Sequence, residues 1–221
     1  FSPWTAFYFL QSLLINLGLG YPFSLLYTAA FTAILLLLWR TLPRVQKVLV
    51  GISSLVAACY FPFAQAYGAP NFNTLLALHS TNMEESTEIL TIFPWYSYLV
   101  GIFIFALGVI AIRRKKESEK ARWNTFDSLC LVFSVATFFV APVQNLAWGG
   151  VFKLKDTGYP VFRFAKDVIV NNNEVIEEQE RMAKLSGMKD TWTVTAVKPK
   201  YQTYVVVIGE SARRDALGAF G

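Results

Sequence analysis

Long stretches without a charged residue alternate along the chain with short charged segments. The charge-free stretches are residues 1–39, 48–83, 89–112 and 128–152. The hydrocarbon core of a bilayer is about 30 Å thick, so a helix needs about 20 mainly apolar residues to cross it. The pattern therefore predicts an α-helical integral membrane domain over residues 1–150.

The first charge-free stretch is too long for a single crossing. It is interrupted by Gly18, Gly20 and Pro22, residue types that favour a turn followed by the first turn of a new helix. We therefore expect about five transmembrane helices. The predicted spans are 2–19, 22–39, 45–67, 95–112 and 125–144, and residues 70–90, of mixed polar and apolar character, are expected to form a short helix at the membrane surface.

Basic residues follow the second and fourth predicted spans. They are Arg40, Arg44 and Lys47 in one loop, and a basic cluster within residues 113–122 in the other. The positive-inside rule places both loops in the cytoplasm. The C-terminal part of the chain then faces the periplasm, so we expect a multi-pass protein of a bacterial inner membrane.

Composition agrees with this topology and excludes other classes. The chain is 54% hydrophobic and only 16% charged, which is too apolar for an ordinary soluble domain. Its formal net charge of +5 does not indicate a nucleic-acid partner, because the basic residues lie between apolar stretches. Cys59 and Cys130 lie inside such stretches and predict buried thiols, not a disulfide framework.

The character of the sequence changes after residue 150. We interpret residues 151–202 as a periplasmic linker, in which the polar, acidic stretch of residues 171–180 is an exposed helix or a linker segment. Residues 204–208 (YVVVI) are typical of the buried first strand of a parallel α/β sheet, so we expect a second domain to begin at residue 203.

Glu210 and Ser211 follow this predicted strand directly. Ligands of open α/β sheets collect at the carboxyl ends of the strands, and a carboxylate there can bind a metal ion. The alternative is ordinary structure, with Ser211 capping a helix and Glu210 solvated.

A second group of polar residues lies in the predicted surface segment. In a helix, Thr81 and Glu85 would share one face, next to Asn82. The alternative interpretation is that Ser80 and Thr81 begin a helix and that the glutamates form a solvated face. His79 is the single histidine and is expected to be an interfacial residue and not a metal ligand, because no cysteine or second histidine lies near it.

The order of these parts, ending in YVVVIGESARRDALGAFG, resembles the phosphoethanolamine transferases of the alkaline phosphatase and sulfatase superfamily. The resemblance covers essentially the whole chain. It implies that residues 203–221 begin a truncated α/β alkaline phosphatase-like periplasmic domain and that Glu210 is a zinc ligand. The family's nucleophile is a downstream threonine, which we expect beyond Gly221. Ser211 does not occupy its place, and this fragment is expected to be inactive.

The chemistry implied by the resemblance is a double displacement. Zinc activates the threonine hydroxyl, which attacks phosphatidylethanolamine and takes up phosphoethanolamine while diacylglycerol leaves. The group then passes to a periplasmic glycan or lipid, which is an osmoregulated periplasmic glucan, lipid A or the lipopolysaccharide core. Of these, the chain looks most similar to the glucan-modifying branch.

Thr81, Asn82 and Glu85 match the TN-x-x-E segment with which the family contacts the donor headgroup. The match implies that Glu85 pairs with the ethanolamine ammonium and that Thr81 donates a hydrogen bond to the phosphate. Ala77 stands where several relatives carry asparagine, which is a departure from the family's donor site.

Two alternative functions remain open at this point. A phosphoglycerol transferase of the lipoteichoic acid synthase type has the same plan of five spans and an external domain, although the GES-x-R-R and TN-x-x-E sequences argue against it. A non-catalytic membrane scaffold or a transporter is the other alternative. Transporters usually carry ionisable residues at mid-membrane, and the predicted spans have none there.

Overall fold

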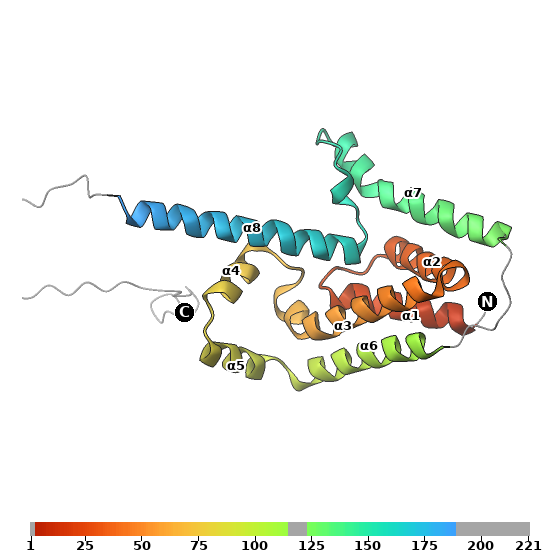
Figure 1. The fold of residues 1–221 in the computed structure, drawn as a ribbon, viewed down its shortest axis with the longest axis horizontal. Coiled ribbons are helices and arrows are strands. Elements are labelled where there is room, and N and C mark those ends of the chain that lie inside the picture. Colours follow the sequence, from red (N-terminus) through yellow and green to blue (C-terminus); the bar gives the residue numbers. More distant parts are fainter. Residues whose placement is uncertain (1–2, 115–122, 189–221) are drawn as a thin grey trace, which may run out of the picture. The chain divides into compact units, whose positions relative to one another are not determined.

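The computed structural model describes residues 3–114 and 123–188, with the backbone alone over residues 83–86. All regular structure within these ranges is helical (Figure 1). The elements are α1 (Pro3–Gly18), α2 (Leu25–Thr41), α3 (Pro43–Tyr67), α4 (Phe72–Ser80), α5 (Met83–Ile92), α6 (Trp95–Arg113), α7 (Thr125–Ala147), the 3-10 helix η1 (Leu154–Asp156) and α8 (Pro160–Ser186). The predicted strand at 204–208, together with Glu210 and Ser211, lies outside the described residues.

Three of the described helices, α3, α6 and α7, are long and apolar enough to cross a membrane. Five spans were expected, and the difference lies in the first charge-free stretch. Its helices α1 and α2 contain 16 and 17 residues. At about 1.5 Å per residue they are about 24 and about 26 Å long, shorter than a hydrocarbon core of about 30 Å. The turn at residues 19–24 takes up the missing length, which a count of uncharged residues does not reveal.

Two glycine turns lie against each other at one end of the bundle. Gly20, between α1 and α2, has a φ of 82°, and Gly68, after α3, has a φ of 72°. A Cβ atom on Gly20 would overlap the backbone of Gly68, so a larger residue there would force the turns apart. The start of the second helix also differs from the prediction, because α2 begins at Leu25 and Pro22 lies in the turn before it.

The most extensive helix contact in the described structure is between α3 and α6. Small residues allow the two backbones to approach closely. A Cβ atom on Gly101 would lie 2.7 Å from the carbonyl oxygen of Ala58, and one on Gly108 would lie 2.6 Å from the Cβ of Ser54. The α3–α6 pair is therefore a tight, small-residue interface.

Helix α1 is joined to its neighbours by buried side-chain hydrogen bonds. Two run from α1 to α3 and two connect α1 with α2. The pairs are Gln11 with Ser54 (3.1 Å), Gln46 with Tyr8 (3.3 Å), Asn16 with Thr28 (3.1 Å) and Thr32 with Ser12 (3.1 Å). Such bonds fix the relative rotation of helices whose surfaces are otherwise apolar.

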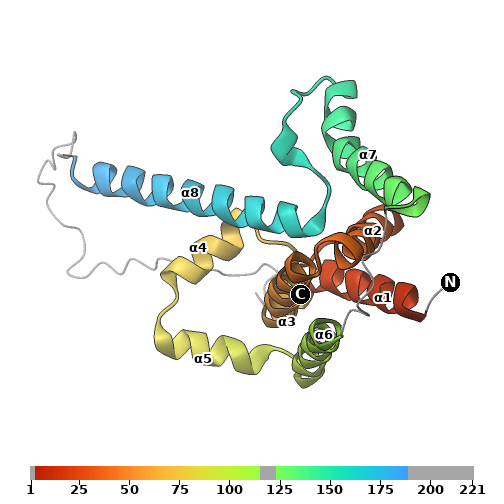
Figure 2. The same cartoon turned by 45° about the vertical axis from the view of Figure 1, so that its right-hand side comes forward.

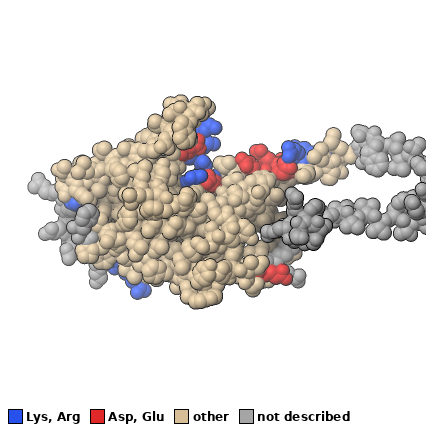
Figure 3. All heavy atoms as spheres, turned by 180° about the vertical axis from the view of Figure 1, so that it is seen from behind, with Lys and Arg blue, Asp and Glu red and all other residues tan. Residues whose placement is uncertain are grey.

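The end of α2, which carries Arg40, and the end of α6, which is followed by Arg114, lie at the same end of the bundle. The Arg40 Nε lies 3.3 Å from the Asp127 carboxylate at the start of α7. Asp127 also forms a capping box with Asn124. The guanidinium of Arg114, after α6, stacks on the Trp39 ring of α2 at 3.7 Å. Between the charged regions, Figure 3 shows a broad face with few Lys, Arg, Asp or Glu side chains, as a membrane-inserted bundle requires.

The predicted surface helix at 70–90 forms as two helices, α4 and α5 (Figure 2). The interruption lies at Thr81, whose ψ of 131° is extended. The hydroxyl groups of Ser80 and Thr81 donate back to α4 carbonyl oxygens, and such bonds compete with continuation of the helix. The predicted linker contains the 27-residue helix α8, which includes the whole acidic stretch.

Candidate functional site

The predicted donor-binding residues lie where α4 ends and α5 begins. Thr81 is the C-cap of α4, so the interpretation of Ser80 and Thr81 as helix-start residues is wrong. Asn82 is exposed, and Glu85 lies in the first turn of α5. Because the helix is interrupted, Thr81 and Glu85 do not share one helical face as the sequence suggested.

The Thr81 hydroxyl already has a hydrogen-bond acceptor. Its Oγ1 donates to the carbonyl oxygen of Ala77 at 2.5 Å. To donate to a lipid phosphate, the hydroxyl would have to rotate away from this carbonyl. In the present arrangement Thr81 offers a ligand its lone pairs only.

His79 connects α4 with α8. Its Nε2 donates to the Oδ1 of Asn172, with 2.8 Å between the two atoms. Both side chains are on the outside of the helices, so the bond is open to solvent. Among the described residues no group of three or more His, Cys, Asp or Glu side chains could hold a metal ion.

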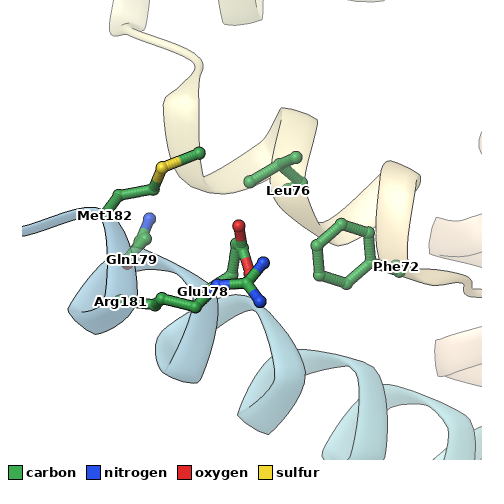
Figure 4. A pocket seen from close by; sticks show the side chains of 6 residues that line it. All are labelled: Phe72, Leu76, Glu178, Gln179, Arg181 and Met182. Carbon is green, nitrogen blue, oxygen red and sulfur yellow. The ribbon is translucent and has the colours of Figure 1, made fainter. Parts of the chain in front are cut away.

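A groove lies between α4 and α8, with a volume of about 610 Å³ (Figure 4). The α4 side contributes aromatic and aliphatic side chains, and the α8 side contributes mainly polar ones. The lining residues are Phe72 and Leu76 of α4 and Glu178, Gln179, Arg181 and Met182 of α8. The groove therefore combines an apolar wall with a charged one, as a site for an amphipathic molecule requires.

Carboxylates outnumber cations on the α8 side of this groove. Glu178 and Arg181 form an ion pair at 2.5 Å. Glu174 and Glu177 line the adjoining hollow with Phe72 and contribute two further negative charges. The groove thus favours a positively charged polar group next to an apolar chain.

The first half of α8 is fixed to the helical bundle by polar contacts. The hydroxyl of Tyr21, in the turn between α1 and α2, donates to Asp167 at 2.8 Å. Arg163 lies 3.6 Å from the same carboxylate and stacks over the Tyr21 ring at 4.9 Å. Lys166 pairs with Asp156 at 3.2 Å and with Asp167 at 3.6 Å. We call this group of residues the α8 anchor.

Burial raises the pKa of Tyr21 well above its ordinary value, and the hydrogen bond from its hydroxyl to Asp167 raises it further. The phenol therefore stays protonated and keeps donating throughout the physiological pH range.

Tyr159, just before α8, adds an aromatic contact to the anchor. It is 1% exposed, and its hydroxyl donates to the carbonyl oxygen of Ser134 in α7 at 2.9 Å. Its ring meets the Tyr27 ring edge-on, with 5.8 Å between the centroids. Burial raises the pKa of Tyr159 to about 12. Two phenol groups thus fix the N-terminal half of α8 to the bundle.

Asp167, Asn172 and Tyr21 were not identified by sequence analysis. One signal could have shown that residues 160–186 form a packed helix. Val161, Phe164, Val168 and Val175 recur at helical spacing on one face, and Val175 is fully buried. The pairing partners of α8 lie far away in sequence and leave no comparable local signal.

These features define a helical membrane protein with an amphipathic groove beside its bundle. The chain is 99% identical over all 221 residues to phosphoethanolamine transferase OpgE of Escherichia coli (strain K12), and it spans 42% of the length of that protein. A protein of Haemophilus influenzae named "Putative phosphoethanolamine transferase" is 24% identical over 168 residues, which are 76% of this chain and 31% of that protein. The resemblance to the phosphoethanolamine transferase family is thereby confirmed over the whole chain.

No protein-family model matches the chain, and no solved structure matches it significantly.

Proposed function

We propose that this chain is the membrane-embedded part of an enzyme that transfers phosphoethanolamine from phosphatidylethanolamine to a periplasmic acceptor. The observation that carries the proposal is the 99% identity to phosphoethanolamine transferase OpgE. The acceptor is a periplasmic glycan or lipid. An osmoregulated periplasmic glucan is our first choice of acceptor, and lipid A or the lipopolysaccharide core is the second. The reaction passes through a phosphoethanolamine-threonine intermediate, and the bundle lies in the inner membrane with the tail after α7 in the periplasm.

Glu210 is the proposed zinc ligand of this enzyme. A carboxylate is a suitable zinc ligand, and the remaining ligands and the nucleophilic threonine belong to the part of the enzyme beyond this chain. Zinc bound there lowers the pKa of an attacking hydroxyl and offsets negative charge on the phosphoryl oxygens. The described residues contain no group of three or more His, Cys, Asp or Glu side chains that could hold a metal, so the proposal places no metal among the described helices.

The contribution of this chain is to hold the donor lipid. Phe72 and Leu76 offer an apolar wall to an acyl chain, and Glu174 and Glu177 offer carboxylates to an ethanolamine ammonium. The predicted donor-binding residues Thr81, Asn82 and Glu85 follow in the chain directly after α4. The His79–Asn172 bond connects this segment to α8, the helix that forms the other wall.

Reconstitution of the longer protein in liposomes tests the proposal. The bilayer contains both phosphatidylethanolamine and phosphatidylglycerol, and the headgroup released from each lipid is followed by mass spectrometry. Consumption of phosphatidylethanolamine alone, with loss of bound zinc and of activity in Glu210→Ala, supports the proposal. Consumption of phosphatidylglycerol in its place would favour the phosphoglycerol transferase alternative and refute ours.

A matched pair of variants tests the groove separately. Glu177→Gln removes a carboxylate that lines the hollow, whereas Glu180→Gln removes an exposed carboxylate on the same helix that lines neither hollow. We expect the KM for phosphatidylethanolamine to rise severalfold in Glu177→Gln only. An equal rise in both variants would show that general surface charge, and not the groove, attracts the donor.

Comparison of periplasmic glucans and lipid A from a deletion strain identifies the acceptor. Loss of a phosphoethanolamine mass from the glucan pool supports the first choice of acceptor. Loss of that mass from lipid A or the lipopolysaccharide core, with unchanged glucans, would identify lipid A or the core as the acceptor instead.

A further inference from the structure

Helix α1 begins and helices α2 and α6 end at one end of the bundle (Figure 1). A guanidinium group there stacks on two indole rings. The Cζ of Arg114 is 4.0 Å from the centroid of the Trp4 ring and 3.7 Å from that of Trp39. The Tyr8 ring lies 5.9 Å away on the same side of the bundle. Three helices thus contribute to one cage around a single positive charge.

Two hydrogen-bond donors in this cage have no hydrogen-bond partner among the described residues. The Nη1 of Arg114 and the Nε1 of Trp39 are both buried, and neither finds an acceptor in the described part of the chain. Arg114 also forms no ion pair with a carboxylate among the described residues, although Arg40 at the same end is paired with Asp127. Buried donors without an acceptor are costly, most of all when the donor group is charged.

The guanidinium of Arg114 and the indole of Trp39 stack on each other, so their two N–H groups can donate to the same acceptor group. The acceptor is expected to be anionic, because the guanidinium has no carboxylate partner in the described part of the chain, and it must offer more than one oxygen. A phosphodiester meets both conditions and is the polar group that a bilayer presents where helices end. Trp and Arg are also side chains that suit the membrane interface, because each combines an apolar part with a polar group that reaches the lipid headgroups.

We propose that Arg114 and Trp39 bind the phosphate of an anionic phospholipid at the end of the bundle that carries the basic loops. The Nη1 and Nε1 atoms donate to its phosphate oxygens, and the indole rings keep the guanidinium stacked. The Trp4 side chain is 36% exposed and forms the outer wall of the cage, so a change of its rotamer opens the site to the lipid. This site lies at the opposite end of the bundle from the glycine turns and the α8 anchor.

Native mass spectrometry of the purified longer protein, titrated with phosphatidylglycerol, tests the site. Arg114→Gln removes the caged charge, and Trp39→Phe keeps a stacking ring but removes the Nε1 donor. The matched control is Arg113→Gln, because Arg113 is exposed on the same helical turn and its loss changes the net charge equally. A parallel titration with inorganic phosphate separates a lipid site from a site for the free ion.

We expect the affinity for phosphatidylglycerol to fall about tenfold in Arg114→Gln and about threefold in Trp39→Phe, and by less than about twofold in Arg113→Gln. Equal losses in Arg113→Gln and Arg114→Gln would overturn the proposal, since both would then reflect general electrostatic attraction. Displacement of the lipid by millimolar inorganic phosphate would overturn it as well. If Arg114→Gln does not fold, Trp39→Phe decides alone, and an unchanged affinity in that variant refutes the site.

Discussion

Replacing Tyr21 by phenylalanine removes one hydroxyl group from the contact between the bundle and α8. In the native chain this hydroxyl donates to Asp167 at 2.8 Å, and the Tyr21 side chain is 5% exposed. The ring itself remains, so its stacking with Arg163 is retained. The variant therefore isolates a single hydrogen bond to a charged acceptor.

The expected loss of free energy depends on the interactions that Asp167 retains in the variant. A hydrogen bond to a charged group contributes about 1.5–3 kcal/mol. Asp167 still has Arg163 and Lys166 at 3.6 Å each, so we expect a loss at the lower limit of that range. A loss of about 1.4 kcal/mol raises the equilibrium constant for local opening of α8 about tenfold.

Hydrogen exchange of the backbone amides in residues 160–172 measures this opening. We expect exchange in the Tyr21→Phe variant to be about tenfold faster there and unchanged in α3 and α6. Tyr60→Phe is the matched control, because the Tyr60 hydroxyl donates to the carbonyl oxygen of Gly68 and not to α8. If exchange in residues 160–172 changes by less than about twofold in Tyr21→Phe, or equally in both variants, the proposed role of the anchor is refuted.

Three further predictions concern the bundle. Gly101→Ala is expected to lower stability in detergent by about 1–2 kcal/mol, because the added Cβ would overlap the backbone of Ala58. In the control Gly51→Ala the added Cβ meets only the end of the flexible Ile112 side chain, so this change should be neutral or stabilising. Equal melting temperatures of the two variants would contradict the prediction. Asp127→Ala removes both a capping box and the pair with Arg40 and should cost about 2 kcal/mol or more, measured by the same melting assay. The pKa of Tyr159 is raised from its usual value of about 10 to about 12. Its contribution to the free energy of unfolding is therefore complete below a pH of about 10 and is lost as the pH rises through about 12. In Tyr159→Phe the decline of stability over this pH range should be shallower.

The alternation of charge-free and charged stretches predicts where helices lie, because a helix in lipid must satisfy its own backbone groups and cannot carry unpaired charge. It predicts their lengths less well. The stretch of residues 1–39 contains the turn at 19–24, whose residues are as uncharged as those of the helices beside it. At Thr81 the sequence suggested one continuous surface helix. The hydrogen bond from the Thr81 hydroxyl to an α4 carbonyl oxygen depends on the backbone conformation, so the sequence does not reveal it.

The contacts that define the candidate site join residues far apart in sequence. Tyr21 and Asp167 are separated by 146 positions, and His79 and Asn172 by 93. An amphipathic pattern shows that residues 160–186 have an inner face, but it does not show which helices that face meets. The roles predicted for Glu210 and Ser211 come from resemblance alone, since the structure does not describe these residues.

Helix α8 connects the two parts of the arrangement, because its first half is fixed and its second half forms one wall of the groove. Tyr159, Arg163 and Asp167 hold the first half against α7 and the turn after α1. Glu174, Glu178 and Met182 lie further along the same helix and face the α4 side chains. A continuous helix transmits the position of one end to the other, since its backbone bonds leave little freedom to bend without a proline or glycine, and residues 161–182 contain neither. The geometry of the groove therefore depends on the anchor as well as on its own lining residues.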